Sequence, residues 1–283
     1  MSILELLATH GGRLSSAQIA DALTLNRSTT GTILMTLTER GWLIRQPDLT
    51  YALGPALVPI NQSVRETLRL PEDIDDELQQ LAHRVGYASG LTAVTSHHLI
   101  VIALMGDRRP IPAGVTTGTR MPLDPPAGAV TIAHGDAARQ SDWLRRASPE
   151  TRSELKQTLT RIRADGAGMW GRNANLSVIA TIAPLIESVP ISPGSVVFND
   201  QLIALYGSLV GSAYDLHELS PEPMPVSLIT APVFNIHGHV QWELQIAPFK
   251  QATSLAERRH LLNEIKTTAK QLSHKAGNTD HRD

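Results

Sequence analysis

The sequence predicts an α+β protein with two domains: a small winged helix-turn-helix domain, followed by a larger domain of strands and helices. Its 283 residues exceed the length of a typical single domain. Apolar residues make up 42% and charged residues 18%, which are the proportions of a folded protein. Hydrophobic spacing changes from helical to alternating within the first 54 residues, and Gly and Pro mark breaks near positions 54 and 70. We expect a first domain over 1–54, a linker helix over 55–70 and a second domain over 71–283.

The composition excludes several classes of protein. The chain has no cysteine, which excludes disulfide scaffolds, thiolate metal sites and cysteine nucleophiles. Its apolar runs are shorter than the roughly 18 residues of a membrane span, and its N-terminus lacks the basic region of a signal peptide. The 25 basic and 27 acidic side chains give a net charge of −2, so any affinity for nucleic acid must come from a local surface. We expect a cytoplasmic protein that does not enter a membrane.

Helix and strand signals in the first domain have a definite order. Ser15 and Gln18 have the spacing of a capping box. Asn26 is a cap for the next helix, and Gly41 is a residue that ends one. The expected segments are helices over 2–9, 15–23 and 26–40 and strands over 42–44 and 51–53.

This order of elements is that of a winged helix-turn-helix, whose third helix enters the major groove of DNA. The first turn of that helix is small and hydroxylated with one guanidinium, which suits contacts with base edges. Residues on the hairpin are placed to reach phosphate groups or the minor groove. The candidate DNA-contacting residues are Ser16, Gln18, Arg27, Ser28, Thr29, Thr30, Thr32, Arg45 and Gln46.

The charge of the first domain leaves a second interpretation open. DNA-binding domains usually concentrate positive charge. Here the basic residues are balanced by acidic ones: Arg13, Arg27, Arg40 and Arg45 against Glu5, Asp21, Glu39 and Asp48. The alternative is therefore a small-molecule sensor or adaptor whose winged helix contacts a protein partner.

Five short motifs make the first domain resemble that of IclR-type transcriptional regulators. They are ILELL at 3–7, LSSAQIA at 14–20, RSTT at 27–30, LTERGW at 37–42 and YALG at 51–54. The family commonly has a His-Arg pair where this chain has Gly31-Thr32, which implies a different operator or weaker binding. The resemblance implies three partners: an operator in double-stranded DNA, a small organic effector, and further copies of the chain in a homodimer or a dimer of dimers.

The linker segment has one apolar face, formed by Leu57, Ile60, Val64 and Leu68. Either a second copy of the chain or the neighbouring domain could cover it. In proteins that the chain resembles, this helix and the first helix contribute to dimerisation. Such a dimer fits two operator half-sites about one turn, roughly 34 Å, apart.

The second domain is predicted to contain a mixed sheet with flanking helices, and it resembles the GAF-like effector domain of the same family. Residues 172–222 are extra, and helical patterns within them predict an insertion packed on the domain. The expected strands cover 91–94, 99–104, 226–234 and 240–246. The expected helices cover 71–86, 127–133, 177–186, 200–212 and 254–275, with another beginning after Ser148-Pro149.

The resemblance to the effector domain implies a pocket between sheet and loops. Such pockets have mostly apolar walls with a few polar groups. The apolar set in this chain favours a neutral or aromatic compound over a small dianion. Each residue could equally belong to the packed core. The candidates are Leu123, Ala127, Gly128, Met169, Trp170, Leu228, Gln245 and Ala247.

The sequence has no pattern specific enough to predict a catalytic or a metal-binding site. The nucleotide-binding glycine loops and the G-x-S-x-G elbow do not occur in the sequence. Ser153 and Lys156 are better explained as the surface of a helix. His237 and His239 flank a turn, but nothing places a third and a fourth ligand beside them. We expect no enzymatic activity, no metal site and no cofactor.

Overall fold

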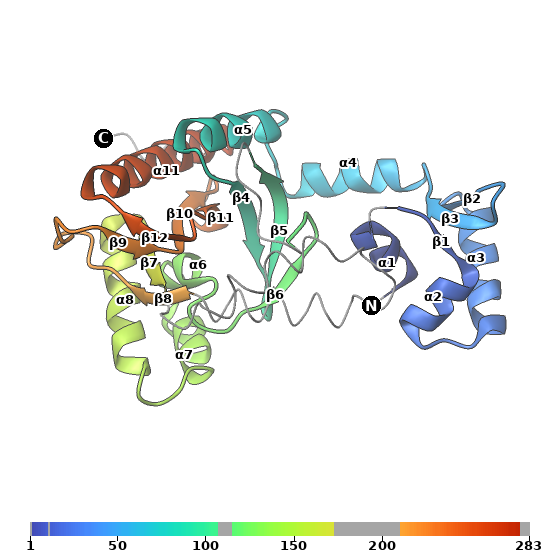
Figure 1. Ribbon diagram of the computed structural model, residues 1–283, viewed down its shortest axis with the longest axis horizontal. Coiled ribbons are helices and arrows are strands. Elements are labelled where there is room, and N and C mark those ends of the chain that lie inside the picture. Colours follow the sequence, from blue (N-terminus) through green and yellow to red (C-terminus); the bar gives the residue numbers. More distant parts are fainter. Residues whose placement is uncertain (1, 11, 107–114, 173–209, 278–283) are drawn as a thin grey trace. The chain divides into compact units, whose positions relative to one another are not determined.

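The computed structural model describes residues 2–10, 12–106, 115–172 and 210–277 (Figure 1). The chain divides into two compact units: the first extends through Leu70 and the second begins at Pro71. Each unit has its own sheet and its own hydrophobic core.

The first unit contains the three predicted helices and the predicted hairpin. The helices are α1 (Ile3–His10), α2 (Ser16–Leu23) and α3 (Arg27–Glu39). The strands are β1 (Leu14–Ser15), β2 (Leu43–Arg45) and β3 (Thr50–Leu53), in the order β1-β3-β2. β1 was not predicted, because two residues are too few to show alternation. We call the β2–β3 hairpin the wing. The core consists of Ile3, Leu6, Leu7, Leu14, Ile19, Leu34 and Leu43.

Local capping bonds determine where α2 and α3 begin. Ser15 Oγ accepts the Gln18 N–H at 3.3 Å and Gln18 Oε1 accepts the Ser15 N–H at 2.8 Å, which confirms the capping box. Asn26 Oδ1 accepts the Ser28 N–H at 2.8 Å, as expected of a helix cap. Gly41 follows α3 with a φ of +70°, a conformation that glycine adopts without strain.

The linker segment forms α4 (Leu57–Thr67), as predicted. Proline is tolerated near the start of a helix, because the first turn has no use for its missing N–H. None of the α4 residues is buried. Its apolar face lies open at Ile60, which is 43% exposed, and at Val64, which is 48% exposed, while Leu57 and Leu68 are half-buried.

The second unit is built on a seven-stranded sheet in the order β6-β5-β4-β11-β10-β7-β8. The α+β class is confirmed, but the described pairs are all antiparallel, in place of the mixed sheet expected. Short connections such as those between β4 and β5 and between β10 and β11 permit only antiparallel neighbours. The strands are β4 (Ser89–Val94), β5 (His98–Met105), β6 (Arg120–Pro122), β7 (Gly168–Arg172), β8 (Val210–Ala213), β10 (Leu228–Phe234) and β11 (Val240–Ile246).

Helices cover the sheet of the second unit. α5 (Ile74–Val85) packs on β4 and β5, and α11 (Leu255–Lys275) packs on β10 and β11 (Figure 1). α6 (Ala129–Ala133) also contacts β10 and β11, and it packs against α7 (Ala137–Arg145) and α8 (Arg152–Asp165). β9 (Met224–Val226) and β12 (Lys250–Thr253) form a separate two-stranded sheet.

Two expectations for this unit are corrected. Residues Val210–Ala213, at the end of the range 200–212 expected to be helical, form strand β8 instead, where Ala213 pairs with Trp170, so a tertiary pairing overrides the local pattern. α6 begins at Ala129 rather than at 127, because Gly128 has a φ of +75° and cannot continue a right-handed helix there. Residues 173–209 of the expected insertion, which include the helix expected over 177–186, and the tail over 278–283 lie outside the described residues.

Candidate nucleic-acid interface and ligand cavity

The first turn of α3 is open to solvent at all but one of the predicted contact positions. Thr30 is fully buried, and its hydroxyl donates to Asn26 O at 3.0 Å. The prediction that Thr30 contacts DNA is therefore wrong, because its side chain anchors the turn to the body of the unit. The exposed predicted residues of α3 are Arg27, Ser28, Thr29 and Thr32.

Two further residues share the exposed side of α3 and were missed in the sequence. Met35 is 57% exposed and Thr36 is exposed, three and four positions after Thr32. Thr32 Oγ1 donates to Ser28 O at 3.2 Å, and Thr36 Oγ1 donates to Thr32 O at 3.1 Å. Because backbone carbonyls occupy these hydroxyls, the surface here is small and largely apolar. Helical spacing from Thr32 is the signal that could have found both residues.

The wing carries one exposed cation. The guanidinium of Arg45 lies 6.0 Å from the centroid of the Tyr51 ring, an arrangement that holds a cation over an aromatic face. Gln46 is half-buried. At the tip of the wing, Asp48 Oδ1 accepts the Thr50 hydroxyl at 2.6 Å, and this hydrogen bond lowers the pKa of Asp48. The wing therefore presents Arg45 beside a turn that carries a carboxylate.

The two predicted residues at the start of α2 have less freedom. Ser16 is half-buried. Gln18 is exposed, but the oxygen of its side-chain amide is engaged in the capping box. Neither residue is as open to a partner as the first turn of α3.

The second unit contains a cavity of about 510 Å³. This volume is typical of small-molecule sites. Its floor is one face of the sheet, where alternate residues of β4, β10 and β11 point the same way. Loop residues 122–128 also line it.

Six of the eight predicted effector-binding residues line this cavity. Leu123 does not, because it is buried in the core. It packs so closely on Gly128 that a Cβ added to this glycine would lie 2.3 Å from Leu123 Cδ1. Met169 does not, because it alternates with Trp170 along β7 and is fully buried on the other face. The six that line the cavity are Ala127, Gly128, Trp170, Leu228, Gln245 and Ala247.

The polar floor of the cavity was missed in the sequence, apart from Gln245. Glu243 is 1% exposed and its Oε1 accepts the Thr131 N–H at 2.6 Å. Burial raises the pKa of Glu243. Gln245 Nε2 donates to Thr92 Oγ1 at 3.1 Å. Glu243 lies two residues before Gln245, so the period of a strand could have identified it.

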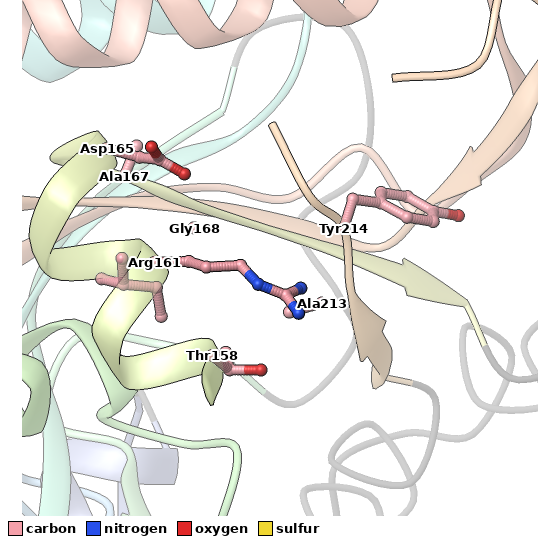
Figure 2. A pocket seen from close by; sticks show the side chains of 8 residues that line it. Thr158, Arg161, Asp165, Ala167, Gly168, Ala213 and Tyr214 are labelled. Carbon is pink, nitrogen blue, oxygen red and sulfur yellow. The ribbon is translucent and has the colours of Figure 1, made fainter. Parts of the chain in front are cut away.

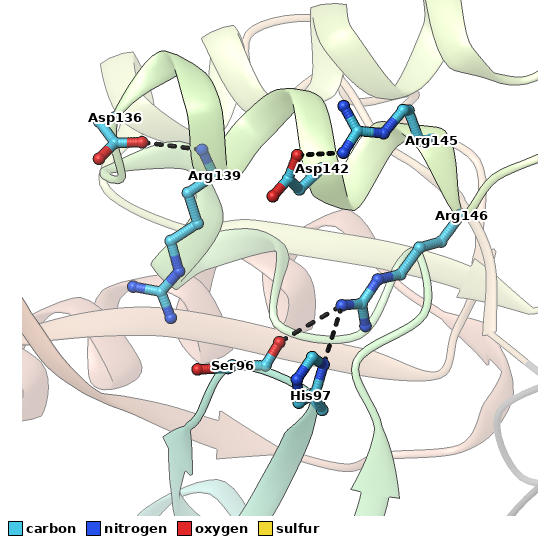
Figure 3. Close-up of polar contacts among 7 residues, drawn as sticks. All are labelled: Ser96, His97, Asp136, Arg139, Asp142, Arg145 and Arg146. Atoms are coloured by element: carbon cyan, nitrogen blue, oxygen red, sulfur yellow. Dashed lines mark hydrogen bonds and ion pairs between the residues drawn. The ribbon is translucent and has the colours of Figure 1, made fainter.

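Arg146 fastens the loop at the mouth of the cavity. It follows α7 and donates to Leu123 O and to Ser96 O, both at 3.3 Å, and it lies 3.4 Å from His97 Nδ1 (Figure 3). These contacts join the loop over 122–128 to the turn between β4 and β5. The loop is therefore held in place by the helical layer rather than by its own hydrogen bonds alone.

A second hollow, between α8, β7 and β8, measures about 10 Å³ (Figure 2). That volume holds one water molecule and no organic ligand. Nearby, His217 Nε2 lies 2.8 Å from Asp165 Oδ1, and Asp215 pairs with Arg161 at 3.7 Å. Within the described ranges no three His, Asp or Glu side chains converge as metal ligands would. Nor does any helix described there have the length and apolar character to cross a membrane.

The first unit thus has an exposed third helix beside a wing, which is the arrangement of a winged helix-turn-helix, and the second unit has a cavity of ligand size. The comparisons with known proteins agree. Residues 1–47 match the family model of the IclR helix-turn-helix domain. Among curated proteins none matches the chain.

Solved structures show the fold of the whole chain. The IclR transcriptional regulator of Alicyclobacillus acidocaldarius has a TM-score of 0.64 at 18% identity, over 97% of this chain and 96% of that one. IclR of Thermotoga maritima has a TM-score of 0.59 at 18% identity, with the same coverage. An IclR homologue of Microbacterium hydrocarbonoxydans, complexed with 4-hydroxybenzoate, has a TM-score of 0.59 at 12% identity, over 98% and 99%. Residues 1–47 are thus similar to the IclR helix-turn-helix domain, and the chain shares its fold with these solved structures.

Proposed function

We propose that this protein is a cytoplasmic regulator of transcription that binds operator DNA through α3 and the wing, and a small organic effector in the cavity. The exposure of the first turn of α3 carries this proposal. Arg27 and Thr29 face solvent there, while Thr30 and Leu34 anchor the helix to the core. Such a helix presents its N-terminal residues to base edges in the major groove. Arg45 on the wing is placed to contact the phosphate backbone.

The regulator binds as a homodimer or a dimer of dimers. The support for this assembly is the apolar face of α4, where Ile60 and Val64 are both more than one-third exposed. Exposed apolar stripes of this kind mark surfaces that bind another protein. A two-fold symmetric copy would cover both stripes at once and would place two recognition helices on half-sites about one turn, roughly 34 Å, apart.

The effector is a neutral or aromatic compound rather than a small dianion. Among the described residues that line the cavity, none is Lys, Arg or His, and most are apolar. A protein of the same fold has been solved with 4-hydroxybenzoate, a small aromatic molecule. Binding of the effector would shift the balance between arrangements of the regulator, with a coupling free energy of about 1–3 kcal/mol.

The alternative function is a sensor or adaptor whose winged helix contacts a protein. The observation that favours it is the apolar character of α3, where Ile33 is 36% and Met35 57% exposed. The balance of charge in the first domain points the same way, since DNA-binding domains concentrate basic residues.

An electrophoretic mobility shift assay with the DNA upstream of the protein's own gene separates the two functions. For a DNA-binding regulator, affinity falls steeply as salt rises, by a slope of about 0.9 per phosphate contact. Arg27→Ala should weaken binding by about tenfold, whereas the matched change Arg40→Ala, at the far end of α3, should not. An absent shift, or one that salt does not weaken, favours the adaptor. Equal effects of the two arginine variants would remove Arg27 from the interface.

A further inference from the structure

Glu243 is the buried acidic side chain of the cavity floor. It lies in β11 with 1% of its surface exposed, and it lines the cavity. The other charged lining residue in the described part is Asp124, which is exposed. A ligand that enters this cavity therefore meets two carboxyl groups and no cation among those lining residues.

The groups beside Glu243 form one polar patch in an otherwise apolar cavity. Register places Thr92 opposite Glu243 on β4, and Thr230 opposite Gln245 on β10. Gln245 Nε2 donates to Thr92 Oγ1 at 3.1 Å. Thr230 Oγ1 is buried and has no hydrogen-bond partner among the described residues. A buried hydroxyl without a partner is costly, so a polar group of a ligand would stabilise the site by pairing with it.

The surroundings of Glu243 do not neutralise it with an ion pair. Its Oε1 accepts the Thr131 N–H, and within the described residues no Lys, Arg or His lies within ion-pair distance of its carboxyl. The charge of Arg139 on α7 is the smallest of the influences that lower the pKa of this carboxyl. Burial raises the pKa of Glu243. A ligand carboxylate beside an ionised Glu243 would meet a like charge, and the two carboxyl groups can lie together only if the pair holds a proton; this requirement weakens the binding of a carboxylate relative to that of an N–H donor.

We propose that Glu243, with Gln245 and Thr230, selects effectors that carry an N–H donor, an amine or an amide, on a largely apolar body, and disfavours those with a carboxylate at this point. The inference rests on the proposed function, because it takes the cavity to be the effector site. The N–H groups donate to the Glu243 carboxyl and to the Thr230 hydroxyl oxygen, while the apolar body contacts walls such as Trp170 and Leu228.

Three probes with the same naphthalene body test the selectivity: 2-(aminomethyl)naphthalene, 2-naphthamide and 2-naphthoate. Isothermal titration calorimetry at pH 7 on the full chain should show the amine and the amide binding at least about tenfold more tightly than the naphthoate. In Glu243→Gln the ratio should fall to about threefold or less. Glutamine retains an oxygen for the Thr131 N–H, so this variant should keep its fold. The control Asp124→Asn removes an exposed carboxyl and should keep the wild-type ratio.

If the amine binds more tightly than the amide, the proposal is supported with an ionised Glu243. If the amine and the amide bind equally, and both more tightly than the naphthoate, it is supported with a protonated Glu243. Equal or tighter binding of 2-naphthoate, an unchanged ratio in Glu243→Gln, or no binding of any probe overturns it. A mobility shift assay tests the proposed function separately. If 2-naphthoate alone releases the protein from DNA, the proposed function holds and the proposed selectivity fails. If the protein binds the probes selectively but has no affinity for DNA, the selectivity holds and the proposed function fails.

Discussion

Substitutions at the neighbouring residues Thr29 and Thr30 should separate the effect of α3 on stability from its effect on DNA binding. Thr30→Val keeps the shape of a buried side chain but removes the hydroxyl that donates to Asn26 O at 3.0 Å. Asn26 O also accepts the Thr30 N–H at 2.9 Å, so the carbonyl keeps a partner after the change. The loss is therefore that of one ordinary hydrogen bond, about 0.5–1.5 kcal/mol of unfolding free energy. DNA affinity should stay unchanged, because the side chain is inside.

Thr29→Val is the matched variant at an exposed position. Valine and threonine have similar helix propensities, so the unfolding free energy should change by less than about 0.5 kcal/mol. A hydroxyl that pairs with DNA should cost about 1 kcal/mol when removed, or roughly fivefold in affinity.

Hydrogen exchange measured by mass spectrometry on the full chain reports the local stability of α3, and the mobility shift assay reports DNA affinity. Faster exchange in Thr30→Val alone and weaker DNA binding in Thr29→Val alone are expected. Weaker DNA binding by Thr30→Val with unchanged exchange would refute the inward placement of that residue. Slower or faster exchange in Thr29→Val with unchanged affinity would refute its role in the interface.

Three further outcomes are expected. Burial raises the pKa of Glu243, so in the pH window above 4.5 the folded protein holds a proton that the unfolded chain has released. The free energy of unfolding of the wild type should therefore fall as pH rises through that window. Urea unfolding across pH should show Glu243→Gln gaining stability relative to the wild type over the same window. Gly31→Ala should raise the unfolding free energy by about 0.5–1 kcal/mol, since a Cβ there meets nothing within 4 Å; a simultaneous loss of DNA affinity in the mobility shift assay would place duplex backbone against this residue, and a less stable variant would contradict the open position. Gly128→Ala should lower the melting temperature, because it combines a φ of +75° with a Cβ 2.3 Å from Leu123 Cδ1, and should weaken probe binding in calorimetry; an unaltered melting temperature would argue against the tight packing at the mouth of the cavity.

Much of the first unit could be predicted because its signals are local. The Ser15–Gln18 capping box, the Asn26 cap and the glycine at 41 each depend on residues within a few positions, so the helix boundaries follow from short stretches of sequence. The inward direction of the Thr30 side chain could not be predicted in the same way. Helical spacing places Thr30 on the side of Leu34, but its four nearest neighbours are hydroxylated or small, so no contrast with apolar residues marks it as buried.

The second unit depends more on distant pairing. The strand at Val210–Ala213 forms because β7 supplies a partner about forty residues earlier. A helical pattern in one segment cannot reveal such a partner. The prediction of six cavity residues came from a resemblance to a family, and the two that fell in the core, Leu123 and Met169, show the limit of carrying positions over without the sheet in view.

The sequence by itself determined the order of elements, the winged helix-turn-helix and the apolar face of the linker, because caps, turns and hydrophobic periods act over a few residues. Only the tertiary structure decided that Glu243, Gln245 and Thr230 meet on one floor. Those residues lie on two strands whose register is set by side chains packed on both faces of the sheet, and a shift of one position would turn each of them to the opposite face.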